Sequence, residues 1–147
     1  MYDLMIIGSG PAGISAALTA KARNLNFIWF GSRALSTKIE KAEKIMNYPG
    51  LPAVTGSEMQ SVFLKQIDDC GITITESQVN SIYDCGGYFA AGADNEIYEA
   101  KAVIMTVGMT TTREIEGEAR LLGCGVSYCA TCDGCLLYTS DAADDKA

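Results

Sequence analysis

Short apolar runs alternate with longer mixed stretches along the first hundred residues. Residues 4–7 are continuously apolar, residues 11–24 are rich in alanine, and residues 26–30 are again mostly apolar. A short continuous apolar run is typical of a parallel strand that is covered on both faces. A strand, a helix and a second strand within about 30 residues form a βαβ unit. The pattern therefore predicts an α/β fold that begins with such a unit.

The next stretch contains helix signals separated by a turn. Residues 37–45 are rich in Lys and Glu and predict a helical segment, and residues 47–52 carry strong turn chemistry. Thr55 and Glu58 form a capping-box pattern, which predicts a helix running to about Cys70. Gly71 is placed to end that helix, and residues 72–75 then predict a third core strand.

Three short strand signals follow and predict a small antiparallel meander. They cover residues 78–84, 88–91 and 96–100, separated by Gly86-Gly87 and by residues 93–95. Residues 102–107 form another apolar run, closed by Gly108. We interpret this run as a separate buried strand.

Three glycines at the first strand–helix junction have the spacing G-x-G-x-x-G. Gly8 permits a sharp turn, Gly10 lets a pyrophosphate approach the backbone, and Gly13 allows close packing of helix on strand. Pro11 suits the first helical turn, where its missing N–H has no partner in any case. An ordinary glycine-rich turn is the alternative, but the strand before it and the helix after it favour dinucleotide binding.

The end of the second predicted strand departs from the usual pattern of an NAD-binding domain. Such a domain often places Asp or Glu there to bind a ribose hydroxyl. This chain has Phe30, Gly31 and Ser32 instead. We interpret Ser32 as a weaker substitute for the acid.

Composition and charge exclude several classes of function. The chain has 147 residues and a formal net charge of −7, and its scattered Lys and Arg residues argue against a nucleic-acid partner. Its apolar runs fall short of the about 20 residues that span a membrane, and we find no signal peptide. We therefore expect a cytoplasmic protein without a membrane partner. The sequence has no histidine, so acid–base chemistry falls to other side chains.

The cysteines near the end of the sequence carry the strongest chemical signal. Cys129 and Cys132 form a C-x-x-C pair followed by Asp133, a pattern suited to thiol–disulfide exchange with a carboxylate that moves the proton. Cys124 and Cys135 add the alternative of a metal or iron–sulfur site with four thiolates. We favour the redox dithiol and predict no metal. The other two cysteines, Cys70 and Cys85, we interpret as buried or half-buried small hydrophobes.

Three motifs in this order resemble the bacterial low-molecular-weight thioredoxin reductases, flavoproteins of the pyridine nucleotide–disulfide oxidoreductase class. They are the glycine turn, Asn47-Tyr-Pro-Gly50, and Cys129-Ala-Thr-Cys132-Asp133-Gly134. The resemblance covers residues 1 to about 134. It implies a Rossmann-like FAD-binding fold with a parallel central sheet and an antiparallel β-meander.

The resemblance also implies site residues. Cys132 would face the flavin, Cys129 would attack the partner disulfide and Asp133 would be the general acid. Asn47 would lie near the flavin, and Val79 would present its backbone to the adenine. Including the glycine turn and Ser32, the expected FAD-binding residues are Gly8, Ser9, Gly10, Pro11, Ala12, Gly13, Ser32, Asn47, Val79, Thr106 and Gly108.

The chain departs from the family pattern in three places. Residues 34–39 replace the usual Gly-Gly-Gln-Leu, no NADPH motif or return segment follows the dithiol, and residues 136–147 do not continue the family sequence. We expect residues 1–116 to be the N-terminal part of an FAD-binding domain. Residues 117–135 would begin the redox and NAD(P)H domain, and residues 136–147 would be a non-native, disordered tail.

The resulting hypothesis is an N-terminal piece of an FAD-dependent disulfide oxidoreductase. The intact protein would pass electrons from NAD(P)H, with NADPH as co-substrate, through FAD to the Cys129–Cys132 pair and then to a thioredoxin-like protein. The resemblance implies a homodimer, and we expect the 147-residue piece alone to be inactive. A related reductase with another donor, such as ferredoxin, and an iron–sulfur or zinc module remain as alternatives.

Overall fold

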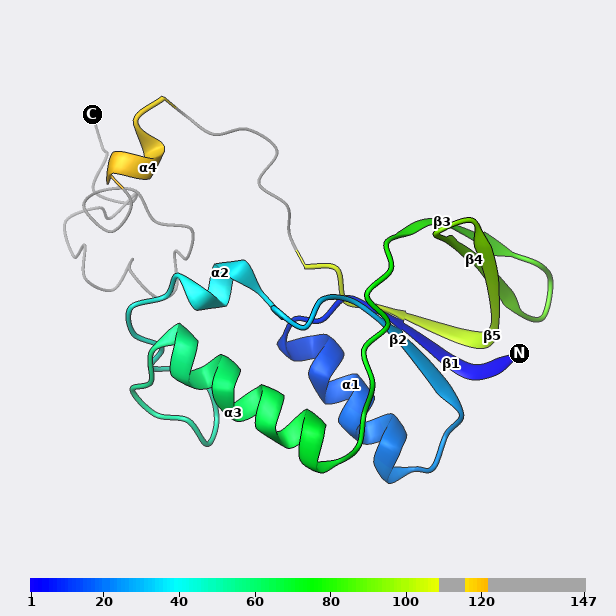
Figure 1. The fold of residues 1–147 in the computed structure, drawn as a ribbon, viewed down its shortest axis with the longest axis horizontal. Coiled ribbons are helices and arrows are strands. Elements are labelled where there is room, and N and C mark those ends of the chain that lie inside the picture. Colours follow the sequence, from blue (N-terminus) through cyan, green and yellow to red (C-terminus); the bar gives the residue numbers. More distant parts are fainter. Residues whose placement is uncertain (109–115, 122–147) are drawn as a thin grey trace, which may run out of the picture. The chain divides into compact units, whose positions relative to one another are not determined.

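The computed structural model describes residues 1–108 and 116–121. The chain divides into two compact units, Met1–Lys44 with Thr55–Met109, and Ile45–Val54 with Thr110–Ala147. The first unit holds almost all the described elements (Figure 1): β1 (Tyr2–Ile7), α1 (Pro11–Ala22), β2 (Phe27–Phe30), α2 (Thr37–Glu40), α3 (Gly56–Asp69), β3 (Val79–Asp84), β4 (Phe89–Ala93) and β5 (Glu96–Met105). In the second unit the structure describes α4 (Glu118–Leu121) and residues 45–54.

The first unit is built on a five-stranded mixed sheet in the order β2-β1-β5-β4-β3. β1 pairs in parallel with β2 and β5, whereas β4 pairs antiparallel with β5 and β3. This arrangement confirms the predicted parallel core and meander. The Rossmann-like α/β fold inferred from the sequence is therefore correct.

The single strand β5 replaces the two separate strands that the sequence predicted at 96–100 and 102–107. Its first half pairs with β4 and its second half with β1, and Ala100 takes part in both ladders. The predicted break fell at Lys101, a charged residue between apolar ones. In the structure the Lys101 ammonium lies 2.7 Å from the Asp3 carboxylate of β1, so the strand continues through it.

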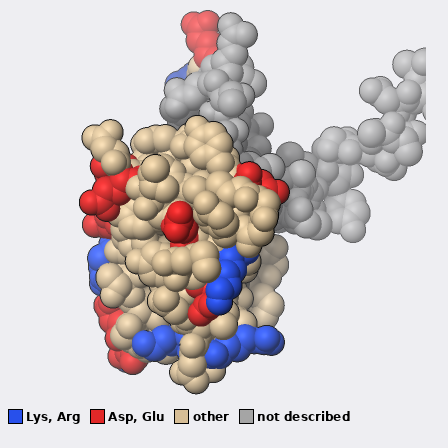
Figure 2. Space-filling model, turned by 90° about the vertical axis from the view of Figure 1, so that its right-hand side faces the viewer, with Lys and Arg blue, Asp and Glu red and all other residues tan. Residues whose placement is uncertain are grey.

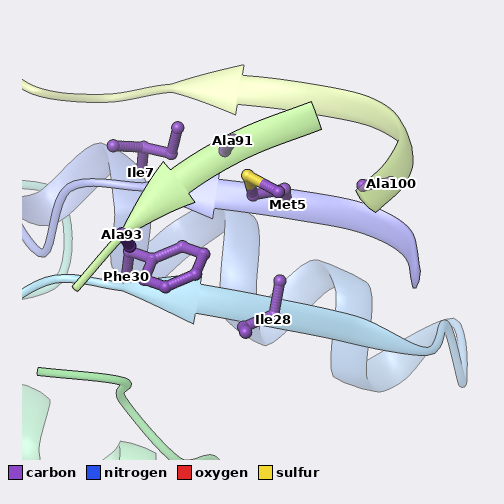
Figure 3. Packing of buried hydrophobic residues seen from close by; sticks show 7 residues of the cluster. All are labelled: Met5, Ile7, Ile28, Phe30, Ala91, Ala93 and Ala100. Atoms are coloured by element: carbon purple, nitrogen blue, oxygen red, sulfur yellow. The ribbon is translucent and has the colours of Figure 1, made fainter. Parts of the chain in front are cut away.

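The meander covers one face of the parallel strands. Figure 3 shows β4 crossing over β1 and β2, with small alanines toward larger side chains. The buried cluster consists of Met5, Ile7, Ile28, Phe30, Ala91, Ala93 and Ala100. The Phe30 and Tyr98 rings meet edge to face, with centroids 5.0 Å apart. Small side chains on β4 let the two layers approach closely.

The opposite face of the parallel strands is covered by α1 and α3 (Figure 1). Alternate residues of a strand point to opposite faces, so Leu4 and Ile6 face away from the meander, and both are buried. The helices contribute buried apolar residues of their own: Ile14, Ala17 and Ala20 from α1, and Met59, Phe63 and Ile67 from α3. β1 is thus buried on both faces, as its apolar run predicted.

Two predicted elements are shorter than expected. The helical segment at 37–45 is only the single turn of α2, capped by Ser36 through a hydrogen bond from Ile39 N. The strand predicted at 72–75 is a single parallel bridge between Thr75 and Phe30. Ile72 and Ile74 are nevertheless buried. The apolar pattern of this segment therefore indicated buried side chains and not a continuous ladder of strand hydrogen bonds.

In the second unit, the predicted turn chemistry at 47–52 is confirmed. Leu51 N donates to Tyr48 O at 3.2 Å, and Gly50 has a φ of +82°. Pro49 and Gly50 stand at the central positions of this turn, which suits a type II turn. An isolated bridge between Ile45 and Val54 closes the loop.

The surface seen in Figure 2 lies on the side of the meander and the N-terminus, and much of it is uncharged. Exposed apolar side chains of the meander include Tyr83 and Ile97.

Cys70 and Cys85 are both exposed and free. Our interpretation of these two cysteines as buried or half-buried small hydrophobes is therefore wrong, because Cys70 ends α3 and Cys85 lies in the β3–β4 connection, where the chain turns at the surface. Of the helices in the described ranges, none has the length and hydropathy needed to cross a membrane.

The capping box predicted for α3 is present. Thr55 Oγ1 accepts from Glu58 N at 3.2 Å, and the Glu58 carboxylate accepts from Thr55 N at 2.8 Å. The hydrogen bonds from the Thr55 backbone and hydroxyl lower the pKa of Glu58. A lowered carboxyl pKa means that this contribution to stability is present at neutral pH and is lost as the pH falls through that lowered pKa.

We expect Thr55→Ala to lower the free energy of unfolding by about 1 kcal/mol at pH 7, because the Glu58 N–H loses its acceptor and the hydroxyl's hydrogen bond to the Glu58 carboxylate is lost as well. Urea unfolding measures the change, and Ser57→Ala, an exposed position in the same turn, is the control. The difference between Thr55→Ala and the unchanged chain should shrink in acid, once Glu58 is protonated. A difference that is constant across this pH range would contradict the role given to Glu58.

Candidate dinucleotide-binding turn

The turn between β1 and α1 adopts a backbone that only glycine accommodates easily. β1 ends at Ile7, Gly8 has a φ of +112°, and α1 begins at Pro11. A Cβ built on Gly8 would overlap the backbone carbonyl group of Thr106. Gly8 therefore makes the sharp turn out of the strand that the glycine motif predicts.

The Gly8 peptide is held by the ends of the two strands that flank β1. Gly8 N donates to Phe30 O at 2.8 Å, and Trp29 Nε1 donates to Gly8 O at 2.8 Å. The Thr106 hydroxyl lies 3.0 Å from Gly8 O and 2.9 Å from Ile7 O, and shares its proton between them. Trp29 was not among the site residues predicted from the sequence, although its position in β2 opposite Ile6 of β1 places it next to the turn.

Gly13 brings α1 onto the turn at very short range. A Cβ on Gly13 would overlap the Gly8 carbonyl oxygen and would lie 2.9 Å from Thr106 Oγ1. Gly13 is buried. This confirms the close helix–strand packing that the third glycine of the motif predicts.

Gly10, in contrast, faces open space. A Cβ built on it meets no heavy atom within 4 Å, although the residue is the N-cap of a twelve-residue helix. No side chain caps this helix end, and its first turn contains no acidic residue. A helix N-terminus that is free of caps and acids presents N–H donors and a positive dipole end to an anion. The exposed Ala12 and half-buried Pro11 lie in the same turn.

Ser9 has a buried side chain, only 6% exposed. Its hydroxyl donates to Leu35 O at 3.2 Å and accepts from Ser32 N at 2.9 Å. A Cβ on Gly31 would come within 2.6 Å of the Ser9 Cβ, so the two segments touch. The Ser9 side chain thus joins the glycine turn to the loop after β2, and the role of Ser9 at the pyrophosphate stays a prediction.

The loop after β2 is where the sequence lacked an acid. Ser32 is exposed, and its hydroxyl accepts from Ala34 N at 3.1 Å. Two carboxylates reach the next residue, Arg33. Glu76 Oε1 accepts from Arg33 N at 2.8 Å, and the Asp68 carboxylate binds the Arg33 guanidinium with both oxygens at 3.0 Å.

Three further predicted FAD-binding residues lie in the described part of the first unit. Val79 begins β3, the last strand of the sheet, so one side of its backbone is free of the ladder. Thr106 and Gly108 follow β5, and Thr106 lies against the glycine turn. The structure therefore brings Thr106 to the turn, while Val79 and Gly108 remain predictions.

Asn47 belongs to the second unit, where it is exposed and precedes the turn at Tyr48–Gly50. Cys129, Cys132, Asp133 and the rival ligands Cys124 and Cys135 lie outside the described residues. Within residues 1–108 and 116–121, the side chains of Cys, Asp and Glu form no group of three that could hold a metal ion. The roles of Asn47 and of the cysteines thus stay predictions.

Comparison with known proteins agrees with this geometry. Residues 2–141 match the family described as pyridine nucleotide-disulphide oxidoreductase. The chain belongs to this family. The matched range includes the whole glycine turn and all five strands of the described sheet.

Two curated relatives are thioredoxin reductases. The enzyme of Bacillus subtilis is 32% identical over 135 residues, covering 91% of this chain and 43% of the relative. The bifunctional thioredoxin reductase/thioredoxin of Mycobacterium leprae is 35% identical, covering 97% of this chain and 32% of the relative. The chain therefore spans less than half the length of these relatives.

Solved structures give the same result. A ferredoxin-flavin thioredoxin reductase from Clostridium acetobutylicum is 47% identical, with a TM-score of 0.74 over 92% of this chain and 47% of the other. The thioredoxin reductase of Streptococcus pyogenes is 34% identical, with a TM-score of 0.77 over 92% of this chain and 45% of the other. These structures confirm the resemblance to thioredoxin reductases and the Rossmann-like fold.

Proposed function

We propose that this chain is the FAD-binding part of a thioredoxin reductase-like flavoenzyme. The observation that carries the proposal is the open, uncapped N-terminus of α1 at Gly10, directly after β1. Anionic pyrophosphate is the ligand for which such a helix end is suited. The similarity to named thioredoxin reductases supports a flavin rather than a free phosphate as its source.

Each residue of the turn has a distinct task in this proposal. Gly10 leaves room for the pyrophosphate, and the N–H groups at the start of α1 donate to it. Trp29 and Thr106 hold the Gly8 carbonyl, so that the turn is already in place before a ligand arrives. FAD, when bound, supplies the redox chemistry, accepting two electrons from a donor and passing them to a disulfide.

The Cys129–Cys132 pair is the proposed acceptor of those electrons within the protein. Cys132 faces the flavin, Cys129 exchanges with a thioredoxin-like protein, and Asp133 supplies the proton to the leaving thiolate. Reduction of a disulfide consumes two electrons and two protons, so both thiols and a proton source are required. We propose that the longer protein is a homodimer that works in the cytoplasm.

The single tryptophan offers a direct test of FAD binding. Trp29 is the chain's one Trp and donates to Gly8 O in the turn that we propose to hold the pyrophosphate. The absorption of a bound flavin overlaps indole emission and allows energy transfer, so we expect saturable quenching of Trp29 fluorescence by FAD. We expect weak binding by the 147-residue chain and no effect of riboflavin, which lacks the pyrophosphate. Quenching by FAD and riboflavin to the same extent would contradict a phosphate site at this turn.

We expect that both Cys129→Ser and Cys132→Ser abolish thioredoxin reduction, because one thiol cannot complete a two-electron exchange. The assay uses an extended reductase, in which residues 1–135 are joined to the C-terminal part of the Bacillus subtilis relative. Cys129→Ser should retain a long-wavelength charge-transfer band from Cys132 thiolate and flavin, and Cys132→Ser should lose it. Cys70→Ser, at an exposed cysteine of the described unit, is the control that keeps full turnover.

A thiolate metal site predicts a different result. Changes at Cys124, Cys129, Cys132 and Cys135 would then release metal to a similar degree, with no charge-transfer band in any variant. Full turnover in Cys129→Ser would end the redox-dithiol proposal.

A second candidate differs only in the electron donor. A solved structure that is 47% identical over 92% of this chain is named a ferredoxin-flavin thioredoxin reductase, so reduced ferredoxin is the second candidate donor beside NAD(P)H. Reading the gene beyond residue 135 tests the two candidates. A second glycine-rich nucleotide motif in the following domain would favour NAD(P)H, and a domain without one would favour ferredoxin.

A further inference from the structure

The segment after α3 delivers a carboxylate to the end of β2. Thr75 N donates to Trp29 O at 2.7 Å, and Gly31 N donates to Thr75 O at 3.1 Å. These two bonds fix Thr75 beside the last residues of β2. The next residue, Glu76, therefore lies at the loop of residues 31–33, and its Oε1 accepts from Arg33 N at 2.8 Å.

This is the place at which dinucleotide-binding folds use an acid. In those folds an Asp or Glu at the end of the second strand accepts a hydrogen bond from a ribose hydroxyl. β2 of this chain ends at Phe30 and is followed by Gly31 and Ser32. Glu76 is exposed, and an ionised carboxylate has about four acceptor positions. One bond to Arg33 N leaves it able to accept from a ligand hydroxyl.

Arg33, the positively charged residue of the loop at 31–33, binds Asp68 of α3. Arg33 Nη2 donates to both oxygens of the Asp68 carboxylate, each at 3.0 Å. The pair is about half exposed on each side, so it adds little to stability, but it draws the guanidinium toward α3. A 2′-phosphate on the ribose needs an arginine at this loop, and here it would meet the Glu76 carboxylate instead.

We propose that Glu76 is the ribose-recognising residue of the nucleotide site and that it selects an adenosine without a 2′-phosphate. The acid missing from the end of β2 is supplied by a segment more than forty residues later in the chain, brought there by the Thr75 bridge. This inference rests on the proposed function, because it takes the glycine turn to hold the pyrophosphate of the same ligand.

Competition with FAD for the Trp29 signal tests the inference on the chain as it exists. The probes are ADP, 2′-deoxy-ADP and 3′-deoxy-ADP. The unchanged chain should bind ADP about tenfold more tightly than at least one deoxy analogue, because a hydrogen bond to a charged acceptor is lost. Glu76→Ala should bind all three equally. Asp69→Ala, which removes another exposed carboxylate, should keep the discrimination.

A second variant separates charge from loop structure. Gln at position 76 keeps an oxygen that can accept from Arg33 N but has no charge. We expect Glu76→Gln to narrow the preference for 5′-AMP over adenosine 2′,5′-bisphosphate, because the repulsion of the 2′-phosphate is gone. Urea unfolding of both variants checks that they remain folded.

Two results would overturn the inference while leaving the proposed function in place. One is a chain that binds ADP and both deoxy analogues equally. The other is a Glu76→Ala variant that weakens all three ligands by the same factor, since Glu76 would then only hold the loop. A chain that binds neither FAD nor ADP would overturn the proposed function, and this inference with it.

Discussion

Gly10→Val is expected to abolish FAD binding while leaving the fold intact. The Cβ of this residue points into open space, so the protein itself has no atom for the valine to strike. The backbone conformation at Gly10, φ −72° and ψ −179°, is one that valine adopts readily. The branched side chain would, however, occupy the space that we assign to the pyrophosphate.

Two measurements on the same variant separate binding from folding. Quenching of Trp29 by FAD should be lost, whereas the free energy of unfolding should fall by no more than about 1 kcal/mol, the usual cost of a poor N-cap. Gly10→Ala, with one methyl group in the same space, should show an intermediate loss of binding. If Gly10→Val bound FAD as tightly as the unchanged chain, the phosphate site could not be assigned to this turn.

The parts of this site that the sequence predicted correctly are those governed by short-range sterics. Gly8 has a φ of +112° at the turn, and a Cβ on Gly13 would overlap the carbonyl oxygen of Gly8; the motif records both of these local requirements. Likewise, the Thr55–Glu58 capping box is a contact between positions three apart. Such features depend on local spacing, and local spacing is what a sequence displays.

The parts that the sequence did not reveal depend on contacts between distant segments. Trp29 donates to the Gly8 carbonyl across 21 positions, and Glu76 reaches Arg33 across 43. The Ser9 hydroxyl joins two loops that are 26 positions apart, a contact that the motif does not reveal, and the predicted role of Ser9 at the pyrophosphate stays a prediction. The sequence predicted two strands where the structure has the continuous β5, again because of a distant contact. Lys101 pairs with Asp3 of β1, 98 positions earlier in the chain.

Gly13→Ala is expected to have the opposite effect to Gly10→Val, destabilising the fold by about 3 kcal/mol. The added methyl group would overlap the Gly8 carbonyl oxygen and crowd Thr106 Oγ1. Relief requires Gly8 to move, and its carbonyl accepts the hydrogen bonds from Trp29 Nε1 and the Thr106 hydroxyl. Each of these bonds contributes about 1 kcal/mol, so a displaced Gly8 loses both in addition to the strain.

Gly10→Ala is the matched control, because it makes the same chemical change three residues earlier, where there is space. Urea unfolding, followed by Trp29 emission and separately by far-UV circular dichroism, measures both variants. Gly13→Ala should shift the transition to lower urea with both probes, and Trp29 should change its emission first if Gly8 moves away from the indole. Equal stability of Gly13→Ala and Gly10→Ala would show that α1 does not pack on the turn as closely as the structure has it, and the preformed phosphate site would lose its structural basis.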